Sequence, residues 1–301
     1  MRIAVWGAGQ IGAATTYRLA TSDHCSELHW INRTYASIVT RVVDLQHGLA
    51  FAPSCRLVKG YDEARAARAL HEVELLVLTQ GEAVPKGGVR QDVLTKNAAI
   101  FDAAVVPHLK DFSGIVLVVT NPVDLLARRV LEQSGLDADR CLGLGTVVET
   151  ARLRAALAKR LRPPRSPRDV LAYAVGSHDE HFVPVTEGAT AMAAKAWSAE
   201  SIEAARIETV NGAARVKTRA PSTIHPVVEG IVSVVEAIAA DRNEILTVST
   251  HDPETGLFYS VPTALGRNGV VERHTDLLQE IQDRLQSSLD SLRELAASLP
   301  S

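Results

Sequence analysis

The first half of the chain consists of two kinds of segment that follow one another in turn, and they differ in their pattern of apolar and polar positions. Short continuous apolar runs occupy residues 2–6, 27–31, 75–79 and 115–120, and such runs are typical of strands that are covered on both faces. Between the runs, apolar residues recur at helical spacing, most clearly over 36–49. Strands that alternate with helices indicate a sheet with helices on both of its faces. We therefore expect an α/β fold that begins with a doubly wound parallel sheet.

The pattern changes from about residue 147 onward. Elements of mixed type are predicted there: a helix over 148–161, a Pro/Arg-rich linker over 162–168, a strand over 170–175, a helix over 224–240, sheet at 245–249 and 256–261, and an amphipathic helix over 277–299. We therefore expect two domains, a dinucleotide-binding Rossmann domain over 1–146 and an α+β substrate domain over 147–301.

The first predicted strand leads directly into a glycine-rich turn and then into a helix that continues to Leu19. The turn carries the residues Gly7, Ala8, Gly9, Gln10, Ile11 and Gly12. In a dinucleotide site the first glycine allows a tight turn, the second lets the backbone approach a pyrophosphate, and the third allows close helix packing. The alternative is a strand-to-helix turn that binds nothing. Because both flanking elements are present, we expect Gly7, Gly9, Gln10, Ile11 and Gly12 to bind a cofactor.

Ligands of doubly wound sheets lie beyond the carboxyl ends of the strands, so the residues after each apolar run are candidates. These are Asn32 with Arg33, Thr79 with Gly81, and Thr120 with Asn121. We expect all six at the cofactor.

Composition narrows the class of protein. The chain has 301 residues, of which 46% are hydrophobic and 22% charged, with a net charge of -3, which argues against a nucleic-acid partner. Cys25, Cys55 and Cys141 form an odd, widely spaced set typical of a reducing compartment. No apolar run is long enough to span a membrane, and a strand that starts at Arg2 leaves no room for a signal peptide. A cytoplasmic protein is expected.

A histidine-containing stretch, Gly176 to Pro184, follows the strand predicted at 170–175. Together with six other stretches in the same order, it resembles the lactate/malate dehydrogenase family along nearly the whole chain. The seven stretches are Gly7 to Gly12, Asp44 to Gly48, Arg90 to Asn97, Asn121 to Asp124, Gly145 to Arg154, Gly176 to Pro184, and Ser260 to Pro262.

The resemblance implies that a hydride passes between C4 of a nicotinamide and C2 of a 2-oxo or 2-hydroxy acid. It implies that His178 exchanges the proton, that Arg152 clamps the substrate carboxylate, and that Arg90 on a mobile loop polarises the reacting carbonyl. Asn121 would orient the nicotinamide and the substrate, and Asn97 would belong to the cofactor site. Arg152 could instead be a solvated helix arginine, Arg90 a surface-turn arginine, and Asn121 a turn-forming asparagine.

Three positions near the histidine leave alternatives open. Glu149 stands where the family has the aspartate that orients the histidine, but Thr146 to Glu149 also matches a helix capping box. Thr223 aligns with a substrate-pocket threonine, or it caps the helix that follows. The segment after His178 replaces the family's Gly-Asp-Ser by Asp179-Glu180-His181, which also resembles a metal site, although no further ligand is identifiable and we expect no metal.

Cofactor and substrate preference rest on two short segments. At the end of the second strand the usual ribose-binding acid is replaced by Asn32, and Arg33 follows, so NADP is favoured over NAD. Asn32 could still bind the ribose of NAD. The family's selector position, six residues before Arg90, is Val84, which predicts a substrate with an uncharged side chain. Lys86 could alternatively bind a second carboxylate, which would make the protein a malate dehydrogenase.

The leading hypothesis is a nicotinamide-dependent 2-oxoacid reductase that acts on a small molecule and forms a homodimer or homotetramer, with the helix over 36–49 as an interface element. Two alternatives belong to other classes: an NAD-dependent glycosidase and a redox-sensing binding protein with a decayed site. The glycosidases typically use a metal-binding cysteine, and no such motif is present here.

Overall fold

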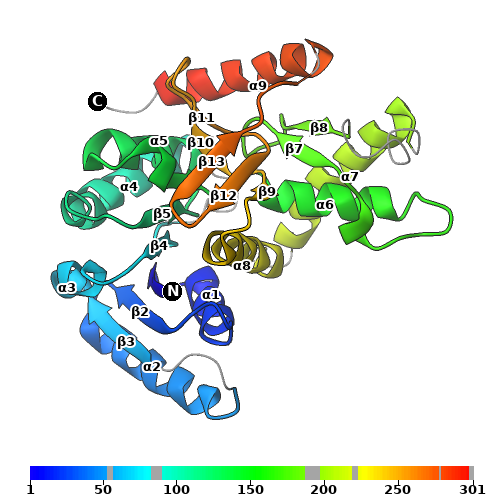
Figure 1. Ribbon diagram of the computed structural model, residues 1–301. Coiled ribbons are helices and arrows are strands. Elements are labelled where there is room, and N and C mark those ends of the chain that lie inside the picture. Colours follow the sequence, from blue (N-terminus) through cyan, green and yellow to red (C-terminus); the bar gives the residue numbers. More distant parts are fainter. Residues whose placement is uncertain (53–56, 83–89, 187–196, 219–222, 278, 298–301) are drawn as a thin grey trace.

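A large sheet organises the protein. The computed structural model describes all residues except 53–56, 83–89, 187–196, 219–222, 278 and 298–301 (Figure 1). The 8-stranded sheet has the order β11-β10-β6-β5-β4-β1-β2-β3. Its strands are β1 Arg2–Trp6, β2 Glu27–Asn32, β3 Leu57–Asp62, β4 Leu75–Leu78, β5 Ile115–Val118, β6 Cys141–Gly143, β10 Ser249–His251 and β11 Phe258–Ser260. Strands β1 to β6 run parallel, and β10 and β11 extend the sheet in antiparallel fashion.

Helices cover both faces of this sheet because its strands are apolar on both faces. In β1, Ile3 and Val5 pack into the core on one face, and Ala4 and Trp6 pack into the core on the other. Helices α1, α2 and α8 contribute to the first core, and α3, α4, α5 and α9 contribute to the second. The helices are α1 Gln10–Ala20, α2 Tyr35–Leu49, α3 Ala66–Leu70, α4 Arg90–Ile100, α5 Val123–Ser134, α6 Val147–Ala158, α7 Ala199–Lys217, α8 His225–Ala240 and α9 Gln279–Ala297.

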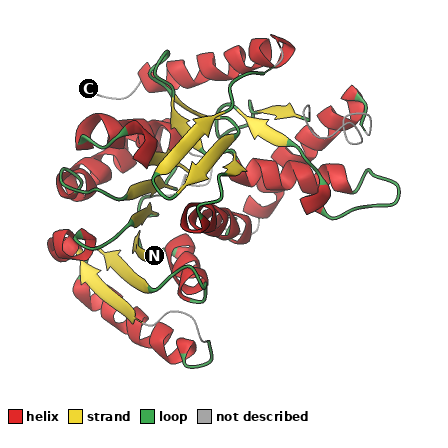
Figure 2. Cartoon of the chain, viewed as in Figure 1, coloured by secondary structure: helices red, strands yellow, loops and turns green. Residues whose placement is uncertain are grey.

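Two small sheets complete the fold. A three-stranded sheet has the order β13-β12-β9, and β7 pairs with β8. Helices α6 and α7 lie with β7 and β8 in the right-hand part of the molecule (Figures 1 and 2). The bounds are β7 Tyr173–Val175, β8 Val183–Val185, β9 Glu244–Leu246, β12 Thr263–Gly266 and β13 Gly269–Arg273. Short 3-10 segments occupy Glu63–Arg65, Val106–His108, Ala138–Arg140 and Pro167–Asp169, and a π-helical turn at Phe101–Val105 follows α4.

The doubly wound sheet predicted from the apolar runs is confirmed. The strand predicted at 170–175 is shorter, since β7 begins at Tyr173. Neither α7 nor the β12–β13 hairpin was predicted from the sequence. Among the described side chains of α7, Ala205 and Thr209 are buried, so its apolar periodicity is too weak to indicate a helix.

Residues from both halves of the chain lie in each of the two cores. Helix α8 packs against α1, and β10 and β11 join the first-half strands in one sheet. The domain division at 146/147 therefore stays a prediction. None of the described helices is long and apolar enough to cross a membrane.

Candidate functional site

The glycine turn after β1 is tied to the neighbouring strand β2. The backbone N–H of Gly7 donates to the Ile31 carbonyl at 2.9 Å, and Trp30 Nε1 donates to the Gly7 carbonyl at 2.9 Å. Gly7 has a φ of +124°, a conformation that side chains disfavour. Gly9 occupies the N-cap of α1, so the backbone N–H groups of the first helical turn follow it directly.

The space around each glycine tests whether this turn fits a dinucleotide. A Cβ on Gly7 would lie 2.5 Å from Thr79 Oγ1, and a Cβ on Gly12 would meet the Gly7 carbonyl oxygen. A Cβ on Gly9 would meet nothing within 4 Å. The outer glycines are therefore needed for packing, whereas Gly9 leaves an open backbone surface at a helix N-terminus. That surface fits a pyrophosphate.

Hydrogen bonds tie the residues after β4 and β5 to neighbouring segments. The hydroxyl of Thr79 donates to the Trp6 carbonyl at 3.1 Å, and that of Thr120 donates to the Gln80 carbonyl at 2.6 Å. Asn97 is fully buried, and its Nδ2 donates to the Asn121 carbonyl at 2.8 Å.

The segment after β4 is held by the same asparagine. Asn97 Oδ1 accepts the Glu82 N–H at 2.7 Å, and Gly81, which lies next to Glu82, has a φ of +147°. Because the amide of Asn97 is committed to the protein's own backbone, Asn97 can act on a cofactor only by holding these neighbouring segments.

The end of β2 carries the residues that sequence analysis connected with NADP. Asn32 Nδ2 donates to Ser37 Oγ at 2.7 Å, which holds the start of α2 against the strand end. Arg33 is exposed, and no hydrogen bond or ion pair joins it to another residue in the part of the chain that is described. No acidic side chain ends this strand.

Four of the predicted site residues come together around Glu149 on α6. Glu149 Oε2 lies 2.9 Å from His178 Nδ1, and Glu149 Oε1 accepts a hydrogen bond from Arg152 Nη1 at 3.1 Å. Arg152 Nη2 donates to Thr223 Oγ1 at 3.3 Å. The residues come from α6, from the turn after β7 and from the segment before α8. The carboxylate thus bridges the imidazole and the guanidinium.

Burial and charge act in opposite directions on Glu149. Burial by itself would raise the pKa of this carboxyl, but the charge and hydrogen bond of His178, together with the charge of Arg152, hold the pKa below its usual value. Glu149 is therefore an anion at neutral pH. An anion beside Nδ1 orients the imidazole and stabilises its protonated form, with Nε2 on the opposite edge of the ring.

The capping alternatives for this cluster are not formed. Thr146 occupies the N-cap of α6 without a side-chain cap, since its hydroxyl donates to the Ala174 carbonyl and its N–H donates to Ser260 Oγ at 3.0 Å. At α8 the N-cap is Ile224, so Thr223 lies one residue outside the helix.

Asp124, for which the sequence predicted no role, supports the histidine. Asp124 Oδ2 accepts the backbone N–H of His178 at 3.0 Å. Burial raises the pKa of the Asp124 carboxyl to about 6, although the His178 N–H opposes this rise. The sequence feature that could have indicated this residue is its acidic side chain in the first turn of α5, where its neighbours are apolar.

The divergent segment after His178 forms a turn that Asp179 stabilises. Asp179 Oδ1 accepts hydrogen bonds from Ser177 Oγ and from the His181 N–H, each at 2.7 Å. Across the residues that the structure describes, no three His, Cys, Asp or Glu side chains are grouped so that they could hold a metal ion.

The loop that carries the predicted specificity residues is not part of the described structure. Val84 and Lys86 lie outside the described residues. Arg90 is the first residue of α4, and its side chain also lies outside the described set.

Comparison with known proteins connects this geometry to a family. The family model described as lactate/malate dehydrogenase, NAD binding domain, matches residues 1–143. An L-lactate dehydrogenase of Halalkalibacterium halodurans is 30% identical over 311 residues, which cover 99% of this chain and 97% of the relative. The chain belongs to the lactate/malate dehydrogenase family. It is a nicotinamide-dependent oxidoreductase of the 2-hydroxyacid dehydrogenase type.

Other relatives agree with this assignment. The L-lactate dehydrogenase of Geobacillus stearothermophilus is 29% identical, covering 98% of this dehydrogenase and 96% of the relative. A minor L-lactate dehydrogenase from Enterococcus mundtii shares the fold at a TM-score of 0.88 and 23% identity, over 99% of this chain and 98% of that one. A lactate dehydrogenase from a deep-sea metagenome library has a TM-score of 0.87 at 27% identity, over the same shares.

Proposed function

We propose that the protein is an NADP-preferring reductase of small 2-oxo acids with uncharged side chains, and that it also catalyses the reverse oxidation. The observation that carries this proposal is the bridge from His178 through Glu149 to Arg152. It provides, within one cluster, a histidine with an anionic partner and an arginine that can bind a carboxylate.

Each of these residues has a role in the proposed reaction. Arg152 binds the substrate carboxylate, with Thr223 beside its guanidinium. His178 donates a proton to the oxygen that develops at C2 during reduction and takes it back in the reverse direction, while Glu149 stabilises the imidazolium. The nicotinamide cofactor, when bound, supplies the hydride. Asn121 orients the substrate, and Arg90 polarises its carbonyl.

The preference for NADP rests on the end of β2. An acid at this position would repel a 2′-phosphate, but the chain has Asn32 there, and its amide bonds to Ser37. The exposed Arg33 next to it offers a guanidinium that matches a phosphate. A higher kcat/KM with NADH than with NADPH would contradict this preference.

The preference for an uncharged substrate rests on Val84 in the sequence. An apolar side chain cannot pair with a second carboxylate, whose burial would be costly. We expect pyruvate or a branched 2-oxo acid to be reduced with higher kcat/KM than oxaloacetate. A preference for oxaloacetate that is lost in Lys86→Ala would show that Lys86 reads the substrate.

The test of the catalytic assignment is NADPH oxidation with a panel of 2-oxo acids. His178→Ala and Arg152→Leu are expected to abolish turnover, and Arg152→Leu should also weaken substrate binding. Arg154→Leu is the matched control for Arg152, because the guanidinium of Arg154 donates to the Ala172 carbonyl and stacks on Tyr173 outside this cluster. Failure of the unaltered protein to reduce any 2-oxo acid, with cofactor binding intact, would contradict the proposal and favour a sensor.

We also propose that the dehydrogenase is a homodimer or homotetramer, with α2 in the interface. A cleft of about 470 Å³ between α1 and α2 is lined by Tyr17, Leu45 and Phe51, among others. Phe51 is 94% exposed and Val43 is 44% exposed. An exposed apolar area of this kind supports association with a second copy.

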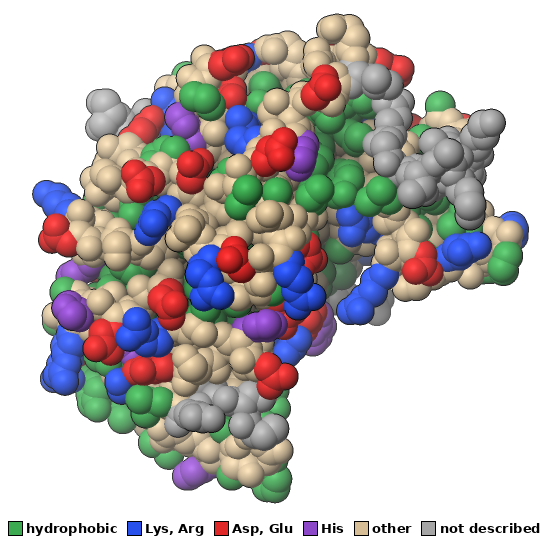
Figure 3. Space-filling model, in the orientation of Figure 1, with side chains coloured by type: hydrophobic (Ala, Val, Ile, Leu, Met, Phe, Trp, Pro, Cys, Tyr) green, Lys and Arg blue, Asp and Glu red, His purple; other side chains and the backbone are tan. Residues whose placement is uncertain are grey.

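The remaining expectations rest on composition. Lys and Arg are interspersed with Asp and Glu on the face drawn in Figure 3, which supports a small-molecule enzyme without a nucleic-acid partner. Cys25 and Cys141 are buried thiols, in keeping with the proposed cytoplasmic location. The division into a dinucleotide domain over 1–146 and a substrate domain over 147–301 is retained as part of the proposal.

A further inference from the structure

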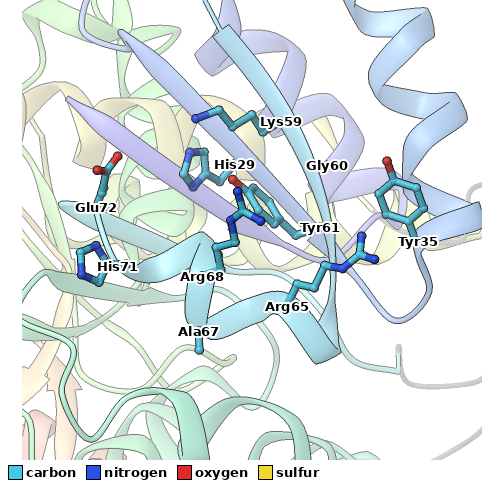
Figure 4. Close-up of a pocket in the computed structure, with 10 residues that line it drawn as sticks. All are labelled: His29, Tyr35, Lys59, Gly60, Tyr61, Arg65, Ala67, Arg68, His71 and Glu72. Carbon is cyan, nitrogen blue, oxygen red and sulfur yellow. The ribbon is translucent and has the colours of Figure 1, made fainter.

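The segments that follow β2 and β3 meet beyond the ends of these two strands. The register of the two parallel strands places Asn32 opposite Asp62. Tyr35 follows Asn32 by three residues, and Arg65 follows Asp62 by three. Arg65 stacks on Tyr35, and its guanidinium carbon lies 5.0 Å from the centroid of the ring (Figure 4). Arg33 lies two residues before this tyrosine. The carboxyl edge of the sheet therefore carries two arginines and an aromatic ring where a cofactor's adenosine half is expected.

The guanidinium of Arg65 has room and charge for a further anion. Asp62 Oδ1 accepts the Arg65 backbone N–H at 3.1 Å and lies 4.0 Å from Arg65 Nε. That carboxylate is thus used mainly to fix the backbone of the 3-10 turn. The Arg65 side chain remains 57% exposed, so its distant ion pair with Asp62 contributes little to stability.

A cleft of about 730 Å³ opens beside the stacked pair. Its lining is richer in basic than in acidic side chains, since Lys59, Arg65 and Arg68 face it together with Glu72 (Figure 4). Because Lys59 pairs with Glu27, the charges that remain are those of Arg65 and Arg68 against that of Glu72. The potential of the cleft therefore favours an anion, and its Tyr35 end borders the segment that begins at Arg33.

We propose that Arg65, held in place by Tyr35, binds the 2′-phosphate of the adenosine ribose and determines the NADP preference together with Arg33. This inference rests on the proposed preference for NADP. A guanidinium can stack on an aromatic ring and still present its N–H groups to a phosphate, which an ammonium does less well. Stacking also restricts the side chain before the ligand arrives, so that less conformational entropy is lost on binding.

The test compares two probes that differ only in the 2′-phosphate, adenosine 2′,5′-bisphosphate and 5′-AMP, by titration calorimetry with the full chain. The unaltered protein should bind the bisphosphate more tightly. Arg65→Ala should reduce the affinity ratio of the two probes about tenfold, the size expected for one charge-assisted contact at an exposed site. The affinity for 5′-AMP should not change.

Further variants separate stacking from general charge. Tyr35→Phe should keep the ratio because it keeps the ring, whereas Tyr35→Ala should lower it, and Arg65→Lys should give an intermediate value. Arg68→Ala is the matched control: it removes the same charge from the same cleft, three residues further along the chain, and should lower the ratio far less than Arg65→Ala does. An equal loss in Arg68→Ala would overturn the assignment to Arg65.

The two levels of the proposal fail in different ways. If Arg33→Ala abolishes the preference for the bisphosphate and Arg65→Ala leaves it intact, the NADP preference stands and the role of Arg65 is wrong. If the unaltered protein binds both probes equally, the NADP preference itself is wrong, and the role of Arg65 fails with it.

Discussion

At the scale of single residues, the carboxylate of Glu149 lies between an imidazole and a guanidinium and has little contact with water. Its contacts to His178 and Arg152 measure 2.9 and 3.1 Å. Glu149 is one methylene longer than the aspartate that the resemblance places at this position, and its two carboxylate oxygens contact one group each. Glu149 therefore links His178, the proposed proton-exchanging residue, to Arg152, the proposed carboxylate clamp.

Removing the charge of Glu149 should impair catalysis more than folding. Glu149→Gln keeps the side-chain length but withdraws the anion that stabilises the imidazolium, so we expect kcat to fall by about tenfold or more. Steady-state kinetics and a thermal melt measure the two effects separately. Glu149→Asp keeps the charge, with the shorter side chain that the resemblance places in the family, and serves as the control. Unchanged kcat and KM in Glu149→Gln would show that the bridge has no kinetic role.

The buried carboxyl of Asp124 should make stability depend on pH. Since its pKa is raised to about 6 in the folded protein, the folded state binds more protons than the unfolded state between about pH 4 and 6. Stability should therefore fall as pH rises through this window.

Asp124→Asn keeps an oxygen acceptor for the His178 N–H and abolishes the titration. It should gain stability relative to the unaltered protein by up to about 3 kcal/mol as pH rises from 4 to 7. Urea unfolding at several pH values measures this difference, with the exposed Asp111→Asn as control. A difference that is independent of pH would contradict the account.

At the scale of elements, different glycines of the turn between β1 and α1 are expected to serve folding and cofactor binding. Gly12→Ala places a methyl group against the Gly7 carbonyl and Thr79, and should lower the free energy of unfolding by about 1–3 kcal/mol. Gly9→Ala meets open space, so its melting temperature should match that of the unaltered protein. Cofactor binding, measured by calorimetry, should nevertheless weaken in Gly9→Ala. Unchanged affinity there would argue against a pyrophosphate at this turn.

At the scale of the whole molecule, the exposed apolar residues of α1, of α2 and of the turn that follows α2 should determine the oligomeric state. Phe51→Glu places a charge in the proposed interface, and because Phe51 is 94% exposed in the single chain, the fold of the protomer should be unaffected. We expect sedimentation to show a dimer or tetramer for the unaltered protein at micromolar concentration and a monomer for the variant. A protein that is already monomeric would contradict the proposed interface.

The sequence by itself determined the features that depend on neighbouring residues. The glycine turn was predictable because its steric needs are local, and the parallel sheet was predictable because strands covered on both faces must be continuously apolar. Glu149 and Arg152, three positions apart on one helix, were expected on a common face for the same reason.

Only the tertiary structure decided which distant segments meet. Apolar periodicity shows that a face is buried but not which element covers it, so the addition of β10 and β11 to the main sheet was not foreseen. The contact of Asp124 with the His178 backbone and the stacking of Arg65 on Tyr35 join residues far apart in the chain. Such contacts form because the sheet brings strand ends and loops to one edge, and their geometry depends on the packing of the whole molecule.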